Sequence, residues 1–271
     1  MKALLNFSPD EYFFFKNTLN LPFGCTFVFC SISTEILNKM LEHKNHLYDC
    51  EKCLFRTLSC RFLPANEFEL IRRASVQMRF TKGETILKQG IKASNLFFLH
   101  RGVVKFNFHG ENGKNFILTL VSGPKLLGGA NLFFNETNLF SLVAVEDCDV
   151  CFIDAPVFKN ALVKNGNYML SVFEHSVGMF QASIFNFISL AHKQVNGRIA
   201  EILMYLSKSV YTNNDYALTL SRKEISEFAA CSHENVINTL SRFNKEGIIL
   251  LEGKKITIVD MEKLQEISKH G

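Results

Sequence analysis

The middle of the chain, from about residue 61 to residue 155, is divided into short apolar or alternating segments by turns that contain glycine. The segments span residues 95–99, 103–108, 116–121, 142–145 and 150–153, and glycines stand at positions 83, 90, 102, 110, 113, 128 and 129. Short segments of this kind, bounded by glycine, are typical of β-strands. Many strands at this spacing predict a β-sandwich or roll.

Residues 157–193 show a different periodicity and contain no internal proline. Apolar residues recur there in steps of four and three, which places them on one stripe of a helix. A long apolar stripe needs a partner surface, so we expect a parallel helix pair in a homodimer. The alternative is that the stripe packs only on the β domain of its own chain. The stripe consists of Met169, Phe173, Val177, Phe180, Ile184, Phe187 and Ala191.

The last third predicts two short helices followed by a β-hairpin. Ser221 and Glu224 fit a capping box at the start of the first helix, and Ser232 can cap the second. The inward face of the second helix is formed by Val236, Leu240 and Phe243. Gly247 ends this helix, and apolar segments at 248–251 and 255–259 flank residues 252–254. The pattern predicts a winged helix-turn-helix.

Composition limits what the 271 residues can do. The 30 Lys and Arg residues exceed the 26 Asp and Glu residues by only four, so the chain does not hold nucleic acid by net charge alone. No apolar run approaches the roughly 18 residues of a membrane span. Asp10 and Glu11 interrupt a would-be signal peptide. We therefore expect a cytoplasmic protein without membrane contact, in which the eight cysteines are reduced.

Four regions result from these patterns. Residues 1–45 form an N-terminal extension without an assignable fold, and Met40 offers an alternative start. Residues 46–156 hold a cysteine-rich segment and the β-roll, residues 157–193 the dimerisation helix, and residues 194–271 the winged helix-turn-helix. The predicted fold class is α+β.

The cysteine-rich segment contains Cys50, Cys53 and, after six intervening residues, Cys60. Close cysteines in a reducing compartment point to metal or redox chemistry. The residues alone leave three interpretations open: structural zinc completed by His43 or His46, a dithiol that switches by disulfide formation, and no ligand role.

In order along the chain, Asn196-Gly197-Arg198-Ile199-Ala200, residues 221–225 and residues 231–236 resemble the CRP/FNR family of bacterial transcription regulators. The resemblance covers roughly residues 50–260. It implies a sensor β-roll of the cyclic-nucleotide-binding jelly-roll type, a long dimer helix, a winged helix, a pseudo-palindromic site in double-stranded DNA, and contact with RNA polymerase.

The resemblance also bears on the effector. Family members that bind cyclic AMP carry a Gly-Glu-Leu segment and an Arg-Ser-Ala segment, where this chain has Gly128-Gly129-Ala130 and Phe140-Ser141-Leu142. A cyclic phosphate would lose its charge-assisted arginine partner, so cyclic AMP is not expected. Residues Phe106, Phe116 and Phe140 line either an apolar pocket or a filled core.

The N-terminal cysteines resemble the oxygen-sensing FNR branch of the family. That branch implies a 4Fe–4S cluster held by Cys50, Cys53, Cys60 and a distant cysteine, for which Cys151 is the match and Cys148 the competitor. The expected function is a transcription regulator that senses oxygen, nitric oxide or redox state. The alternatives are structural zinc, haem, or a degenerate sensor domain that responds to another small ligand or to none.

The second helix of the helix-turn-helix is expected to enter the major groove. Glu234 matches the family's cytosine-reading glutamate, and Asn238 stands where relatives read guanine, which favours adenine here. The predicted DNA-binding set is Arg222, Ser232, His233, Glu234, Asn238, Ser241, Arg242 and Lys245. An enzyme is the rival class. Between residues 95 and 154 there is no His-x-His pair, the chain has no Gly-x-Ser-x-Gly motif, and we expect no enzymatic activity.

Overall fold

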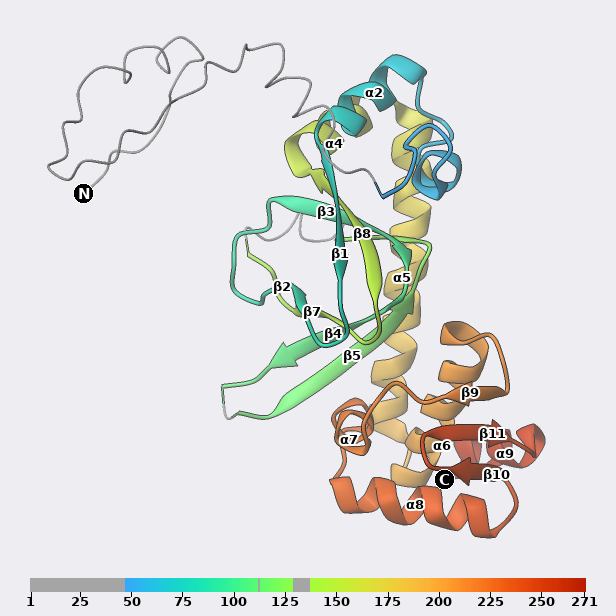
Figure 1. Ribbon diagram of the computed structural model, residues 1–271. Coiled ribbons are helices and arrows are strands. Elements are labelled where there is room, and N and C mark those ends of the chain that lie inside the picture. The colour runs from blue at the N-terminus through green and yellow to red at the C-terminus, as the bar shows by residue number, and fades with distance from the viewer. Residues whose placement is uncertain (1–46, 112, 129–136) are drawn as a thin grey trace, which may run out of the picture. The chain divides into compact units, whose positions relative to one another are not determined.

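The computed structural model describes residues 47–111, 113–128 and 137–271, so the extension 1–45, Met40, His43 and His46 lie outside it (Figure 1). Within the described part of the roll, eight strands form two four-stranded antiparallel sheets, in the orders β1-β8-β3-β6 and β2-β7-β4-β5. The strands are β1 (Ser75–Phe80), β2 (Thr85–Leu87), β3 (Asn95–Arg101), β4 (Val103–His109), β5 (Asn115–Ser122), β6 (Lys125–Leu127), β7 (Ser141–Ala144) and β8 (Cys148–Asp154). The roll and all five expected strands are confirmed.

Strand β3 is buried on both of its faces, which explains why its sequence is apolar without alternation. Phe97 and Leu99 face the other sheet and pack in the core between the two sheets. Leu96 and Phe98 point to the opposite face and pack in a second core. The second core is covered by the helical segments α2 (Ala65–Arg73), η2 (Phe55–Ser59), α4 (Ala155–Lys164) and the start of α5 (Gly166–His192).

Residues 65–73 correct the prediction that the chain is β from about residue 61. They form helix α2, because Phe68 and Ile71 are spaced for one helical face and both are buried in the second core. Proline at position 64 and the acidic residue Glu67 in the first turn also suit a helix start.

The predicted single helix over 157–193 is wrong in its first turns. Two helices, α4 and α5, are separated at Asn165, whose backbone is extended at φ −130° and ψ 91°. The apolar face of α4, formed by Phe158, Ala161 and Leu162, is buried against the roll in the second core, whereas the stripe on α5 is exposed. Helix α4 therefore belongs to the roll, and the candidate dimer helix is α5 alone.

All seven stripe residues on α5 are exposed in the single chain, from 40% for Ile184 to 67% for Phe180 among the large ones. The alternative in which the stripe packs on its own β domain is therefore wrong. Among the α5 side chains that the structure describes, only Tyr168, Val172 and Ser189 are buried.

The C-terminal part is a winged helix-turn-helix, as predicted. Both reciprocal hydrogen bonds of the Ser221–Glu224 capping box are present, and the Ser232 hydroxyl accepts from the Asn235 N–H. Strand β9 and helix α9, which packs on α6, were not expected. The elements are α6 (Val195–Tyr205), η3 (Leu206–Val210), β9 (Asp215–Ala217), α7 (Arg222–Ala229), α8 (His233–Lys245), β10 (Ile249–Glu252), β11 (Lys255–Ile258) and α9 (Met261–His270).

Across the described ranges, no helix combines the length and the apolar character that crossing a membrane would require.

The turn between α7 and α8 generates a stability prediction. Ala230 has a left-handed backbone, with φ 47° and ψ 51°, a conformation that costs a residue with a Cβ atom about 1–2 kcal/mol. We expect Ala230→Gly to raise the free energy of unfolding by about 0.5–1 kcal/mol, because the relieved strain exceeds the added entropy of the unfolded chain. Urea denaturation measures the change. The neighbouring variant Ala229→Gly, in the last turn of α7, should have the opposite sign, and equal signs would contradict the assignment.

Candidate functional site

Helix α8 presents the predicted DNA-reading residues on one solvent face. Its periodicity buries Val236, Thr239, Leu240 and Phe243 against the rest of the domain. The opposite face is exposed and carries His233, Glu234, Ile237, Asn238, Ser241, Arg242 and Lys245. The exposure satisfies the geometric requirement for a recognition helix, and the base contacts themselves stay predictions.

Two members of the predicted DNA-binding set differ from the others. The Ser232 hydroxyl is 3.1 Å from the Asn235 N–H that it caps, so its first role is to start α8. Arg222 lies in the first turn of α7, where burial lowers the pKa of its guanidinium. Arg222 therefore lies on α7 and not on α8, and its side chain is half-buried.

The winged helix is joined to the roll by an ion pair with little exposure to solvent. Lys105 Nζ on β4 lies 2.5 Å from Glu224 Oε1, with 13% and 26% of the side chains exposed. The other oxygen of Glu224 accepts the Ser221 N–H at 2.7 Å and completes the capping box. Burial favours a raised pKa for Glu224, but the hydrogen bonds from Lys105 and Ser221 outweigh it and the pKa is lowered. One carboxylate therefore starts helix α7 and holds it against β4.

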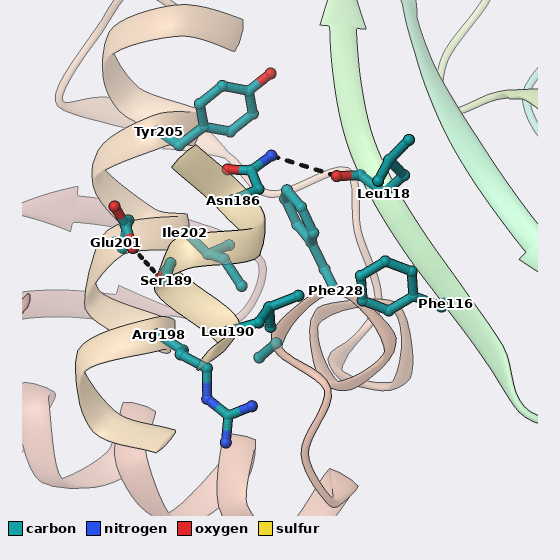
Figure 2. A pocket seen from close by; sticks show the side chains of 11 residues that line it. Phe116, Leu118, Asn186, Ser189, Leu190, Arg198, Glu201, Ile202, Tyr205 and Phe228 are labelled. Carbon is teal, nitrogen blue, oxygen red and sulfur yellow. Dashed lines mark hydrogen bonds between the residues drawn. The ribbon is translucent and has the colours of Figure 1, made fainter. Parts of the chain in front are cut away.

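Side chains of β5, α5, α6 and α7 meet around a cavity of about 20 Å³ (Figure 2). Asn186 of α5 donates to the Leu118 carbonyl at 3.3 Å, and Ser189 of α5 donates to Glu201 of α6. A space of this size holds about one water molecule, so the site is a packed junction and not a ligand pocket.

The four predicted ligand cysteines converge in the second core. Cys50 and Cys53 precede η2, Cys60 follows it, and Cys151 lies on β8; we call these four residues the cysteine cluster. Cys53, Cys60 and Cys151 are buried and Cys50 is half-buried. Cys148 points to the core between the two sheets, where its thiol donates to backbone carbonyls, because positions 148 and 151 lie on opposite faces of β8.

Each thiol of the loop has a polar neighbour. Gln77 Nε2 donates to Cys50 Sγ at 3.4 Å, and the Arg56 N–H donates to Cys53 Sγ at 3.4 Å. The sulfur of Cys60 lies 3.4 Å from the Tyr168 hydroxyl. Burial raises the pKa of Cys60 and of Cys151 to about 12, so both are neutral thiols near pH 7 in this arrangement.

The cluster is close-packed. Cys50, Cys53, Cys151 and His100 line one cavity of about 10 Å³, and the Cys60 side chain lies outside its lining. Over the residues that the structure places, no three His, Cys, Asp or Glu side chains are grouped so as to hold a metal ion. The soft donors for a metal are thus gathered in one core but not arranged around a common point.

Residues that the sequence did not single out fix this segment to the roll. The Tyr48 ring stacks on His100 at 4.3 Å, and its hydroxyl donates to the buried Asp149 at 2.8 Å. Burial favours a raised pKa for Asp149, but hydrogen bonds from Arg79 and Tyr48 outweigh it and the pKa is lowered. His100 Nε2 is buried without a hydrogen-bond partner, and burial lowers the pKa of this imidazole to about 4. An acidic residue at position 149, between the apolar residues Cys148 and Val150, is the signal that could have identified this anchor.

The space between the two sheets, where the family resemblance places an effector, is narrow and apolar. Phe106 and Phe140 line a cavity of about 20 Å³ together with Leu87, Phe97, Leu127, Gly128 and Leu142. Phe116, expected beside them, lies instead at the junction of Figure 2. Gly129 and Ala130 fall outside the described ranges.

The chain matches two protein families: the cyclic nucleotide-binding domain over residues 77–165 and the Crp-like helix-turn-helix domain over residues 197–267. It is 28% identical over 185 residues to the cAMP-activated global transcriptional regulator CRP of Pasteurella multocida, which covers 66% of this chain and 88% of the relative.

Solved structures agree in fold. FixK2 from Bradyrhizobium japonicum superposes with a TM-score of 0.65 and 17% identity, covering 71% of this chain and 96% of FixK2. A CRP/FNR-family transcriptional regulator from Thermus thermophilus gives 0.60 at 18% identity, covering 71% and 98%. Members of this family bind DNA and typically dimerise. With the roll, the long helix and the winged helix in this order, the chain belongs to the CRP/FNR family of DNA-binding transcription regulators.

Proposed function

We propose that this regulator acts as a homodimer on a pseudo-palindromic DNA site and that the cysteine cluster is its sensor of oxygen, nitric oxide or redox state. The observation that carries the sensing proposal is the convergence of Cys50, Cys53, Cys60 and Cys151 in one buried core. Cysteines about 90 to 100 positions apart in the sequence have no reason from local structure to meet there.

The dimer proposal is supported by the exposed apolar stripe of α5. Six large apolar side chains, 40–67% exposed, follow one face of a 27-residue helix. Pairing this face with a second copy removes the stripe from water and brings two copies of α8 together, which is the arrangement that reads two half-sites one helical turn apart. RNA polymerase is the expected further partner, from the family.

A 4Fe–4S cluster is the cofactor that we propose, with Cys50, Cys53, Cys60 and Cys151 as the residues that would hold it. The donor set fits, since four thiols are what such a cluster requires. The packed arrangement leaves room for about one water molecule, so the segment that carries η2 has to move away from β8 for the cluster to enter. When bound, the cluster supplies a redox-active centre that reacts with oxygen and nitric oxide.

The narrow apolar space between the sheets supports the expectation that cyclic AMP is not the effector. The described lining has no arginine or glutamate for a cyclic phosphate or a ribose. A buried phosphate without a cationic partner is strongly disfavoured. Although the CRP relative is activated by cAMP, we propose a different signal for this chain.

The first prediction concerns base reading. Asn238→Ala should weaken binding to an in vitro selected site by about ten-fold and relax the preference for adenine at one position of each half-site, because a bidentate contact is worth about 1–3 kcal/mol. Fluorescence anisotropy with matched and mismatched duplexes measures both effects. Lys263→Ala, on the exposed face of α9, is the control that should change neither. Unchanged affinity and preference in Asn238→Ala would remove this residue from the reading set.

The second prediction concerns the dimer. Phe180→Glu places a charge in the centre of the stripe and should raise the dimer dissociation constant more than about 100-fold, since desolvating the carboxylate costs several kcal/mol. Because Phe180 is 67% exposed in the single chain, the monomer should remain folded. Sedimentation equilibrium compares this variant with Gln181→Glu, an exposed neighbour outside the stripe. Equal dissociation constants for the two variants would contradict the interface.

The third prediction concerns the cofactor. Protein purified anaerobically without chelators should contain about four irons and four sulfides per chain and bleach in air. Cys53→Ser and Cys151→Ser should lose the iron and the difference in promoter activity between air and nitrogen, while Cys231→Ser in the helix-turn-helix keeps both. A colourless protein with about one zinc per chain would instead make the cysteines a structural site.

A further inference from the structure

Few of the described side chains of helix α5 are buried within their own chain. Of its described side chains, Tyr168 and Val172 are buried near the start and Ser189 near the end, while the stripe between them faces solvent. The break at Asn165 separates α5 from α4, so the start of α5 is not held by a continuous helix. Tyr168, with none of its surface exposed, is the largest anchor at this end.

The anchor contacts the cysteine cluster directly. Tyr168 packs against Phe158 of α4, and its hydroxyl lies 3.4 Å from Cys60 Sγ. Both residues are completely buried, and Cys60 is the hydroxyl's one hydrogen-bond partner that the structure gives. A buried phenol hydroxyl cannot replace a lost hydrogen bond with one to water, so the loss of its partner leaves it unsatisfied.

We propose that Tyr168 is the positioning residue that couples the state of Cys60 to the start of the dimer helix. While Cys60 is a free thiol, its hydrogen bond holds Tyr168 and the first turn of α5 in the second core. When the Cys60 sulfur instead binds the proposed cluster, the Tyr168 hydroxyl loses its hydrogen-bond partner. The first turn of α5 then shifts so that the hydroxyl can form another hydrogen bond.

The shift affects the exposed stripe, because two neighbours of Tyr168 on α5 belong to it. Met169 and Phe173 lie one and five positions further along α5, and both belong to the exposed stripe, at 52% and 63% exposure. A change in the seating of Tyr168 therefore moves the N-terminal end of the proposed dimer seam. This inference deepens the proposed function, because it names the route from the cysteine cluster to the dimer helix.

The test is a double-mutant cycle with Cys60→Ala and Tyr168→Phe in the full chain as a reduced, metal-free protein. Hydrogen–deuterium exchange of the amides at 168–176 is the readout, and it does not require a dimer or a cofactor. Each single variant should accelerate exchange about five-fold, as expected for the loss of one hydrogen bond, and the double variant should do no more than either single one. Cys60→Ser replaces the thiol with a hydroxyl that can still hydrogen-bond to Tyr168, and it should give near wild-type exchange.

Tyr48→Phe is the matched control, because it removes another tyrosine hydroxyl beside the cysteine cluster but lies outside α5. It should leave exchange at 168–176 unchanged. Multiplicative effects in the double variant, or wild-type exchange in Tyr168→Phe, would overturn the link between Cys60 and α5.

A second readout connects the link to the dimer. The dimer dissociation constant should change in Tyr168→Phe in the same direction as in Cys60→Ala and should not change in Tyr48→Phe. Altered exchange with an unaltered dissociation constant would overturn the coupling to the seam. A wild-type protein that binds no iron, or that stays monomeric, would count against the proposed function while the exchange cycle still decides the link.

Discussion

The two-sided burial of strand β3 is the constraint on which the rest of the structure depends. One face closes the core between the two sheets, and the other supports a core formed with helices α2, α4 and the start of α5. A strand buried on both faces has to be covered by further chain, since its apolar side chains cannot face water. Part of this cover is the segment that carries Cys50, Cys53 and Cys60. The same requirement thus builds the roll and brings the cysteine cluster to it.

Two carboxylates with little exposure to solvent attach separate parts of the chain to this frame. Asp149 accepts a hydrogen bond from Tyr48 of the cysteine segment and pairs with Arg79 of β1. Glu224 pairs with Lys105 of the roll and caps the first helix of the DNA-binding motif. Charge-assisted hydrogen bonds in little-hydrated places are directional and costly to break, so each link defines a geometry more than it adds stability. The cysteine segment and α7 are therefore both positioned by the same roll.

The elements that were predicted well are those whose structure is decided by a local sequence pattern or by a capping residue. The capping box of Ser221 and Glu224, the cap at Ser232 and the short apolar segments of the roll bounded by glycine depend on neighbours within a few residues. Helix α2 has local signals in Pro64, Glu67 and the spacing of Phe68 and Ile71, which the prediction of continuous β structure from residue 61 passed over. The break at Asn165 was missed because its cause lies elsewhere: the apolar face of α4 packs with β3 and β8 in the second core, while the stripe on α5 stays exposed. Register with a distant sheet is not visible in a local pattern.

The sequence by itself determined the order of modules, the stripe on α5, the exposed face of α8 and the residue types of the cysteine cluster, because periodicity, caps and donor chemistry are local properties. The tertiary structure decided which side chains meet. It placed Cys151 rather than Cys148 with the loop cysteines, brought Lys105 to Glu224, and set Cys60 against Tyr168. The last two pairs join residues that are 119 and 108 positions apart in the sequence. Only the packing of the roll and of both faces of β3 brings such distant residues within reach of one another.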